Sequence, residues 1–170
     1  MIKFCTQCGD AVEERHTYGR LRPVCPSCGY IHFIDPKVAA AVLIERDGKV
    51  LLTRRANDPQ KGLWVPPGGF VDYDEDPRHA AIRECEEETG LKVEITELVD
   101  VISSVGHAEF RAGGASIVIF YRARVVGGEL AASDDADQVG YFGPGELPDL
   151  AFEPTKTVLE SWGKKSSPVR

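Results

Sequence analysis

Three glutamates in the middle of the chain have a spacing that could bind a metal ion. Glu84, Glu87 and Glu88 lie within the run Arg-Glu-Cys-Glu-Glu-Glu-Thr-Gly. Successive residues of an α-helix turn by about 100°, so Glu87 would lie about 60° to one side of Glu84 and Glu88 about 40° to the other. Carboxylates crowded on one face repel one another unless a cation compensates, and such oxygen ligands suit Mg²⁺ or Mn²⁺. The alternative is the solvated acidic face of an ordinary helix.

The elements that must present these carboxylates can be predicted from the same stretch. We expect a helix from Pro77 to Thr89, because Asp76 suits an N-cap, proline is favoured in a first helical turn and Gly90 can end the helix. A rigid loop, Pro-Pro-Gly-Gly at residues 66–69, precedes it. Cys85, beside Glu84, is expected to be a small buried hydrophobic residue in preference to a reactive thiol.

Four of the five cysteines form two pairs near the N-terminus, Cys5 with Cys8 and Cys25 with Cys28. Two Cys-x-x-Cys pairs can supply four thiolates to a tetrahedral Zn²⁺. Two disulfides are the alternative, but the N-terminus has no export signal, and thiols in the cytoplasm stay reduced. Because sulfur would fill all four coordination positions, this zinc is predicted to be structural.

Short apolar segments around the helix predict a sheet. Strands are expected at residues 38–44 and 50–53, joined by a turn at 45–49, and at 93–95, 116–124 and 139–142. A last helix is expected over residues 153–162. The break at Asp35-Pro36 separates a small N-terminal module. The predicted domains are therefore a zinc ribbon over 1–34, a larger domain over 35–163 and a flexible tail over 164–170.

The composition argues against some classes of partner. The chain has 170 residues, of which 42% are hydrophobic and 28% charged, and its formal net charge is −7. That charge disfavours a non-specific grip on nucleic acid or anionic lipid. No apolar run approaches the ~20 residues needed to span a bilayer. We expect a cytoplasmic protein with neither a membrane nor a nucleic-acid partner, and a homodimer is left open.

The segment from Gly69 to Leu91 follows the pattern G-x5-E-x7-R-E-U-x-E-E-x-G-U, where U is an apolar residue. This pattern resembles the Nudix box, and the likeness extends over residues 36–162. It implies an α+β fold in which a mixed sheet lies between helices, an α/β/α sandwich, here preceded by the zinc ribbon. It also implies a pyrophosphohydrolase that uses Mg²⁺ or Mn²⁺ to split nucleoside diphosphate derivatives.

The resemblance assigns roles to residues. The implied metal ligands are Glu84, Glu87 and Glu88, with a backbone carbonyl of Gly68 or Gly69. Arg83 would orient these carboxylates and complete the catalytic set, and Glu75 would brace the loop. An acid from outside the box often joins such sites, and the candidates are Glu109, Asp134, Asp135, Asp137 and Glu153. Gln138 stands where many relatives have glutamate, and a neutral amide cannot act as a general base.

A zinc ribbon followed by a Nudix domain resembles two groups of enzymes, the NADH pyrophosphatases and the pyrophosphatases that act on ADP-ribose and FAD. The first group carries an SQPWPFP-type segment after the box, which this chain lacks. The second group matches better, for example in Gly62-Leu63-Trp64. ADP-ribose and FAD are therefore the leading substrates, each giving AMP, and NADH or NAD is the alternative.

Residues that could bind such a substrate are less clearly indicated. Phosphates could be held by Arg54, Arg55, Lys61 or Arg111, each of which is otherwise an ordinary surface cation. An adenine ring could stack on Phe33, Phe110, Tyr141 or Phe152, for which core packing is the alternative. Of these we select Arg55, Arg54 and Phe110. Two alternatives from other classes are a non-catalytic nucleotide sensor and a nucleic-acid adaptor built on the ribbon.

Overall fold

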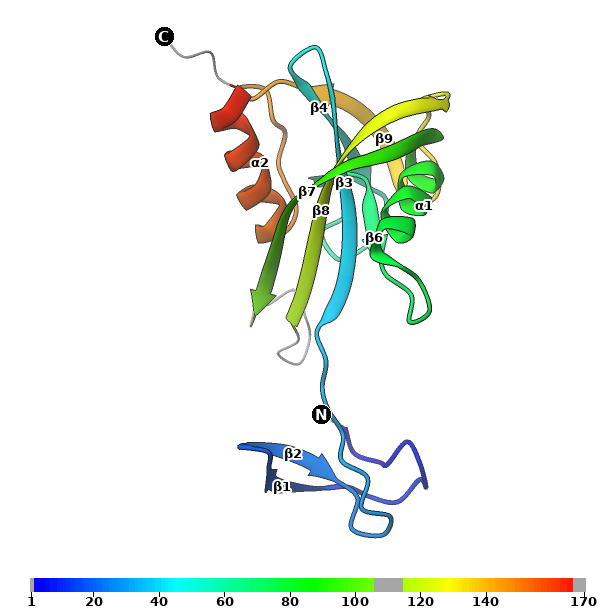
Figure 1. Cartoon of the computed structure of the whole chain (residues 1–170), viewed down its shortest axis with the longest axis vertical. Coiled ribbons are helices and arrows are strands. Elements are labelled where there is room, and N and C mark those ends of the chain that lie inside the picture. Colours follow the sequence, from blue (N-terminus) through cyan, green and yellow to red (C-terminus); the bar gives the residue numbers. More distant parts are fainter. Residues whose placement is uncertain (1, 106–114, 167–170) are drawn as a thin grey trace. The chain divides into compact units, whose positions relative to one another are not determined.

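The computed structural model describes residues 2–105 and 115–166, and Figure 1 shows its elements. The chain divides into two compact units, residues 1–36 and 37–170. In the smaller unit, β1 (Glu13–Thr17) and β2 (Arg20–Val24) form an antiparallel hairpin. The sequence analysis did not predict this hairpin, because most of its residues are exposed and lack an apolar alternation.

The larger unit is built on one mixed sheet. Its hydrogen-bonded order is β5-β4-β3-β8-β7, with β6 paired to β3 and β9 paired to β4. Only the β3–β8 pairing is parallel among the described strands. The strands are β3 (Lys37–Arg46), β4 (Lys49–Arg55), β5 (Trp64–Val65), β6 (Gly68–Phe70), β7 (Leu91–Val105), β8 (Ala115–Gly128) and β9 (Ala136–Phe142).

Two helices cover opposite faces of this sheet (Figure 1). α1 (Pro77–Thr89) buries Ala80, Ala81 and Cys85 in an apolar cluster with one face. α2 (Glu153–Ser166) buries Val158, Leu159 and Trp162 in a second cluster on the other. The α/β/α sandwich with a mixed sheet is therefore confirmed. Among the described residues, no helix has the length and apolarity to cross a membrane.

The bounds of α1 agree with the prediction, and its caps explain why. The Asp76 side chain accepts a hydrogen bond from the Arg78 amide at 2.8 Å, which satisfies one free donor of the first turn. Gly90 has φ 69° and donates its amide to the Glu86 carbonyl at 2.8 Å. Glycine reaches this left-handed conformation without a steric penalty. Both ends of the helix are thus determined by local sequence.

Other elements differ from the predictions. Gly68 and Gly69 belong to strand β6 and not to a loop, because they pair with Ala41 and Ala40 of β3. β7 has 15 residues where three were predicted, since register shifts along its pairing with β8 break the alternation that marks a strand in sequence. α2 extends to Ser166, four residues beyond the predicted end at Trp162.

Candidate active site

β6 approaches α1 closely at its two glycines. A Cβ atom at Gly69 would lie closer than 3.0 Å to the carboxylate of Glu84, a separation that real Cβ atoms essentially never show. A Cβ at Gly68 would meet the backbone of β3 at Ala40 and Ala41 just as closely. A side chain at position 68 would clash with the backbone of β3, and one at position 69 would push the Glu84 carboxylate aside, so the two glycines let the chain pass directly beneath the acidic face of the helix.

Glu88 is the most buried of the three box carboxylates, with 6% of its surface exposed. One carboxylate oxygen accepts hydrogen bonds from the Gly68 amide at 3.2 Å and from the Thr53 hydroxyl at 3.3 Å. Burial raises the pKa of Glu88 to about 8, and the nearby Glu84 carboxylate adds to that increase. The two hydrogen bonds and the Arg55 charge act in the opposite direction but do not cancel it.

Glu84 and Glu87 become progressively more exposed along the same face, with 17% and 45% of their side-chain surfaces accessible. Burial raises the pKa of Glu84, the adjacent Arg83 opposes this, and the charges of Glu87 and Asp134 add to it. The three carboxylates predicted to share one helical face therefore do share it, at three different depths.

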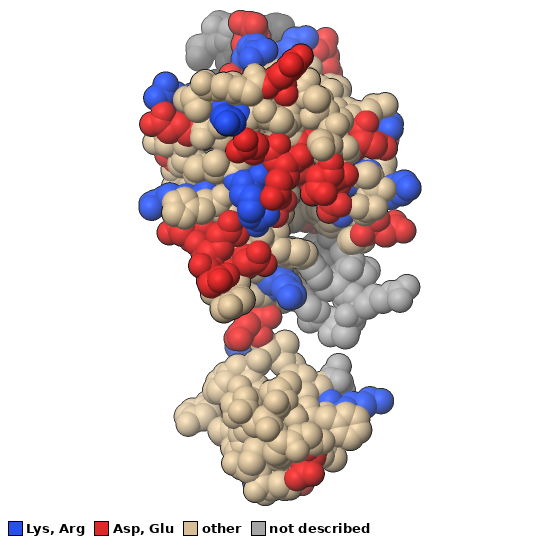
Figure 2. Space-filling model, turned by 90° about the vertical axis from the view of Figure 1, so that its right-hand side faces the viewer, with Lys and Arg blue, Asp and Glu red and all other residues tan. Residues whose placement is uncertain are grey.

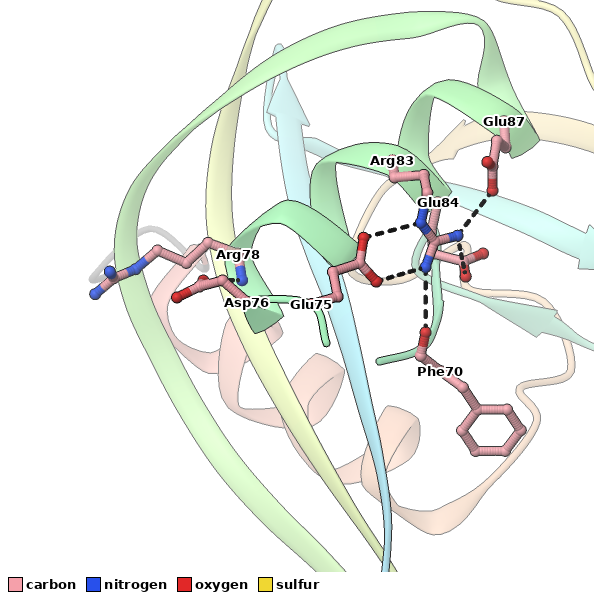
Figure 3. A network of polar contacts seen from close by, with 7 residues as sticks. All are labelled: Phe70, Glu75, Asp76, Arg78, Arg83, Glu84 and Glu87. Atoms are coloured by element: carbon pink, nitrogen blue, oxygen red, sulfur yellow. Dashed lines mark hydrogen bonds and ion pairs between the residues drawn. The ribbon is translucent and has the colours of Figure 1, made fainter. Parts of the chain in front are cut away.

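Arg83 joins the acidic residues into one network, which Figure 3 shows from close by. Its guanidinium binds both oxygens of Glu75, at 3.0 and 2.9 Å. It also donates to Glu84 at 2.8 Å, to Glu87 at 3.0 Å and to the Phe70 carbonyl at 3.3 Å. The hydrogen bonds from Arg83 lower the pKa of Glu75. Arg83 thus positions two box carboxylates while Glu75 fixes the arginine.

The two arginines predicted to bind substrate lie in different surroundings. Arg54 forms a two-pronged ion pair with Asp137 of β9, at 2.7 and 3.0 Å. Arg55 donates to the Pro59 carbonyl at 2.9 Å, and its guanidinium carbon lies 5.0 Å from the centre of the Phe152 ring. Burial lowers the pKa of Arg55, whereas Glu88 is among the carboxylates that raise it. Only Arg55 is thereby linked to the carboxylate site.

The candidate acids outside the box differ in the groups with which they interact. Asp137 is paired with Arg54, and Asp135 accepts a hydrogen bond from Asn57 at 2.6 Å. Glu153 accepts from Lys156 at the start of α2. Asp134 follows Ser133, whose amide binds the Glu88 carbonyl at 3.1 Å, and its charge acts on Glu84. Glu109 and Phe110, both predicted candidates, lie outside the described residues.

The arrangement fits a divalent cation. Three carboxylates lie on one face of α1, two of them have raised pKa values, and the close glycine approach leaves the Glu84 carboxylate no neighbouring side chain at position 69. Such an excess of poorly solvated negative charge is relieved by a hard cation with oxygen ligands. The predicted contribution of a Gly68 or Gly69 carbonyl stays a prediction.

The four N-terminal cysteines form a second candidate metal centre. Their sulfur atoms all lie within 4.8 Å of one another, with Cys5 and Cys28 3.6 Å apart and Cys8 and Cys25 3.5 Å apart. Zinc–sulfur bonds of about 2.3 Å in a tetrahedron place sulfur atoms about 3.8 Å apart, close to these values. The cluster therefore fits a structural zinc with no open coordination position.

Comparisons with known proteins give a consistent result. Residues 35–162 match the family described as NUDIX domain, and residues 3–33 match a zinc-ribbon family described as Nudix N-terminal. An ADP-ribose pyrophosphatase from Methanocaldococcus jannaschii is 40% identical over 131 residues, covering 77% of this chain and 76% of that protein.

Two solved structures are also similar. A NUDIX hydrolase from Nitrosomonas europaea has a TM-score of 0.83 at 33% sequence identity, covering 96% of this chain and 92% of that one. An ADP-ribose pyrophosphatase from Streptococcus suis has a TM-score of 0.59 at 26% identity, covering 80% and 96% respectively.

Proposed function

We propose, because this chain belongs to the Nudix hydrolase family, that it hydrolyses ADP-ribose to AMP and ribose 5-phosphate. The observation that carries the proposal is the 40% identity to an ADP-ribose pyrophosphatase across three quarters of both chains. It is supported by a complete set of box carboxylates, held in one network by Arg83. A catalytically silent sensor is expected to lose box carboxylates, and this chain retains all of them.

The reaction adds water across the anhydride of the diphosphate. One bond between a phosphorus and the bridging oxygen breaks, the water oxygen joins that phosphorus, and each product leaves with one phosphate. We assign Glu84, Glu87 and Glu88 to hold Mg²⁺ or Mn²⁺, which when bound neutralises the diphosphate charge and polarises a phosphoryl group. Arg83 keeps two of these carboxylates at fixed positions, and buried Glu88 is tied to β6 and β4 by its two hydrogen bonds.

Two further residues are proposed to act around this set. Asp134 is the acid outside the box whose charge acts on Glu84, so we assign it as an additional carboxylate of the site. Arg55, which is electrostatically linked to Glu88, is assigned to bind the diphosphate. The four cysteines are assigned to a structural zinc, and small-molecule substrates are the expected partners.

FAD and NADH stay predictions, because the relatives described above are named for ADP-ribose or for the family alone. The test is a panel of ADP-ribose, FAD, NADH and ADP-sugars with Mg²⁺ or Mn²⁺, using Glu88→Gln and, as a matched control, Glu160→Gln on the exposed face of α2. We expect metal-dependent AMP release from ADP-ribose that is lost only in E88Q. Preference for another compound in the panel would overturn the substrate assignment, and no turnover of any would favour the sensor.

A further inference from the structure

The segment that follows β9 is held against the edge of the sheet. The Trp64 amide donates to the Asp149 carbonyl at 3.0 Å, and the Ala151 amide donates to the Trp64 carbonyl at 2.9 Å. Leu150 pairs with Trp64 in a parallel bridge. These contacts fix residues 149–151 to β5, so the position of the next residue, Phe152, is also set by the sheet.

Phe152 has an unusual backbone conformation for its residue type. Its φ is 58°, in the left-handed region that few non-glycine residues adopt. Its amide donates to the side-chain oxygen of Gln60 at 3.1 Å, and Gln60 itself has φ 61°. Strained positions of this kind persist where surrounding contacts enforce them, and they concentrate at ligand-binding sites.

Core packing does not account for the aromatic side chain. Phe152 is half-buried, and neither apolar cluster of the described residues contains it. What it does contact is the guanidinium of Arg55, at 5.0 Å from the ring centre. Arg55 is in turn anchored by the Pro59 carbonyl at 2.9 Å, and it lies two residues along β4 from Thr53, whose hydroxyl donates to Glu88 at 3.3 Å. A partly exposed ring backed by a cation therefore lies next to the carboxylate site.

We propose that Phe152, backed by Arg55, is the surface on which the nucleobase of the substrate stacks. This inference rests on the proposed function. The carboxylate site binds the diphosphate through its metal, and Phe152 supplies the recognition of the nucleoside half that the carboxylates cannot provide. Every base has a flat π-face, and stacking on an aromatic side chain beside an arginine is a common means of holding one. With the base on Phe152, the attached diphosphate extends past Arg55 toward Glu88.

The experiment uses the two halves of ADP-ribose as separate probes. AMP and ribose 5-phosphate are titrated by calorimetry into the full-length, zinc-loaded wild-type protein and into Phe152→Leu, with Mg²⁺ present throughout. Phe33→Leu is the matched control, since Phe33 is an exposed ring with the Arg22 guanidinium 4.5 Å from its centre but belongs to the other unit. Phe152→Trp tests whether another aromatic ring restores binding.

We expect F152L to weaken AMP binding by roughly 5- to 150-fold, which is the loss expected when one base no longer stacks on an aromatic ring. Binding of ribose 5-phosphate should be unchanged. KM for ADP-ribose rises and kcat changes little, F152W recovers AMP binding, and F33L resembles the wild type. Wild-type AMP affinity in F152L, or an equal loss for both probes, overturns the proposal.

The two proposals fail in different ways. If the wild-type protein binds AMP through Phe152 but does not hydrolyse ADP-ribose, the substrate assignment is wrong and the stacking surface stands. If ADP-ribose is hydrolysed and AMP binding does not depend on Phe152, the stacking surface is wrong and the substrate assignment stands. If F152L does not fold, the comparison of F152W with the wild type decides, and a failure of F152W to bind AMP contradicts the proposal.

Discussion

At the scale of single residues, three glutamates of one helix differ because their surroundings differ. Glu88 is buried against β6, Glu84 is mostly covered and held by Arg83, and Glu87 is largely exposed. Burial penalises a carboxylate that has lost its water, so the pKa of Glu88 is raised to about 8 and that of Glu84 is raised as well. Uncompensated negative charge therefore destabilises the site until a proton or a cation neutralises it.

The first prediction concerns the stability of the metal-free protein. The pKa of Glu88 is about 8 in the folded state and 4.5 for an ordinary exposed glutamate, so between these pH values the folded protein binds more protons than the unfolded chain. The contribution of Glu88 to the free energy of unfolding therefore falls as the pH rises through this window. Thermal unfolding is measured from pH 5 to 9. Over this range, the melting temperature of Glu88→Gln relative to that of the wild type should rise by on the order of 5 °C. Glu87→Gln is the exposed control, and parallel curves for wild type and E88Q would contradict the prediction.

The second prediction tests the acid outside the box. Asp134 has φ 53°, a conformation that asparagine also tolerates, so Asp134→Asn removes the charge and keeps the backbone. We expect Mn²⁺ affinity and turnover to fall about 10- to 100-fold. Manganese titration followed by electron paramagnetic resonance measures the first effect independently of activity. Asp137→Asn, which breaks only the Arg54 ion pair, should leave Mn²⁺ affinity intact; equal effects of the two variants would remove Asp134 from the site.

At the scale of elements, the contact between β6 and α1 determines where the carboxylates lie. The two glycines of β6 face different neighbours, since a Cβ at Gly68 would meet the backbone of β3 first, whereas the atoms nearest to a Cβ at Gly69 are those at the end of the Glu84 side chain. A flexible side chain can move aside at low cost, but a paired backbone cannot. The same chemical change should therefore have different consequences at adjacent positions.

The third prediction follows from this difference. Gly69→Ala should displace the Glu84 carboxylate and reduce metal-dependent turnover by about 10- to 100-fold, with a melting temperature close to that of the wild type. Gly68→Ala should instead destabilise the fold by about 1–3 kcal/mol, because β6 can no longer approach β3. Gly145→Ala, which meets no atom within 4 Å, is the control. This account is contradicted if G69A unfolds, or if G69A keeps full activity and loses as much stability as G68A.

At the scale of the whole molecule, the two units have different sources of stability. The larger unit buries two apolar clusters, one on each face of its sheet. Among the described residues of the 1–36 unit, the buried ones are Cys5, Pro23, Val24, Cys25 and His32. Too little apolar surface is buried there to offset the ordering of the chain, so we expect a zinc ion held by the four cysteines to supply most of the folding free energy.

The charge also differs between the units. The 1–36 segment contains four basic and four acidic residues, so the net charge of −7 belongs to the larger unit. Figure 2 shows a face of that unit on which acidic side chains gather around fewer basic ones. A divalent cation reverses the sign locally, which is why an acidic protein can take a polyphosphate substrate.

The fourth prediction is that removing zinc unfolds only the smaller unit. Limited proteolysis after treatment with a strong chelator should cleave within residues 1–36, while the described residues of the larger unit, 37–105 and 115–166, stay protected. Turnover measured after excess Mg²⁺ is restored should stay within a few fold of the untreated value. Resistance of the ribbon to proteolysis after zinc loss, or collapse of the larger unit with it, would show that the units do not fold as described.

The sequence alone determined what local spacing controls. The bounds of α1, the shared face of its three carboxylates and the four-sulfur cluster were all predictable, because caps, helical periodicity and Cys-x-x-Cys pairs involve residues close together in the chain. The fold class could be predicted from the box and is confirmed. Strand lengths were predicted poorly where bulges interrupt the alternation, as along β7.

Only the tertiary structure decided which residues from distant segments meet. Neighbouring Arg54 and Arg55 look alike in sequence, yet the pairing of β4 with β9 brings Arg54 to Asp137, whereas Arg55 donates to the Pro59 carbonyl and lies over the Phe152 ring. The burial of Glu88, the effect of the Asp134 charge on the pKa of Glu84 and the contact of Arg55 with Phe152 likewise depend on long-range packing. Burial and contact are properties of the folded chain, so the depth of each carboxylate and its raised pKa follow from packing that no local pattern records.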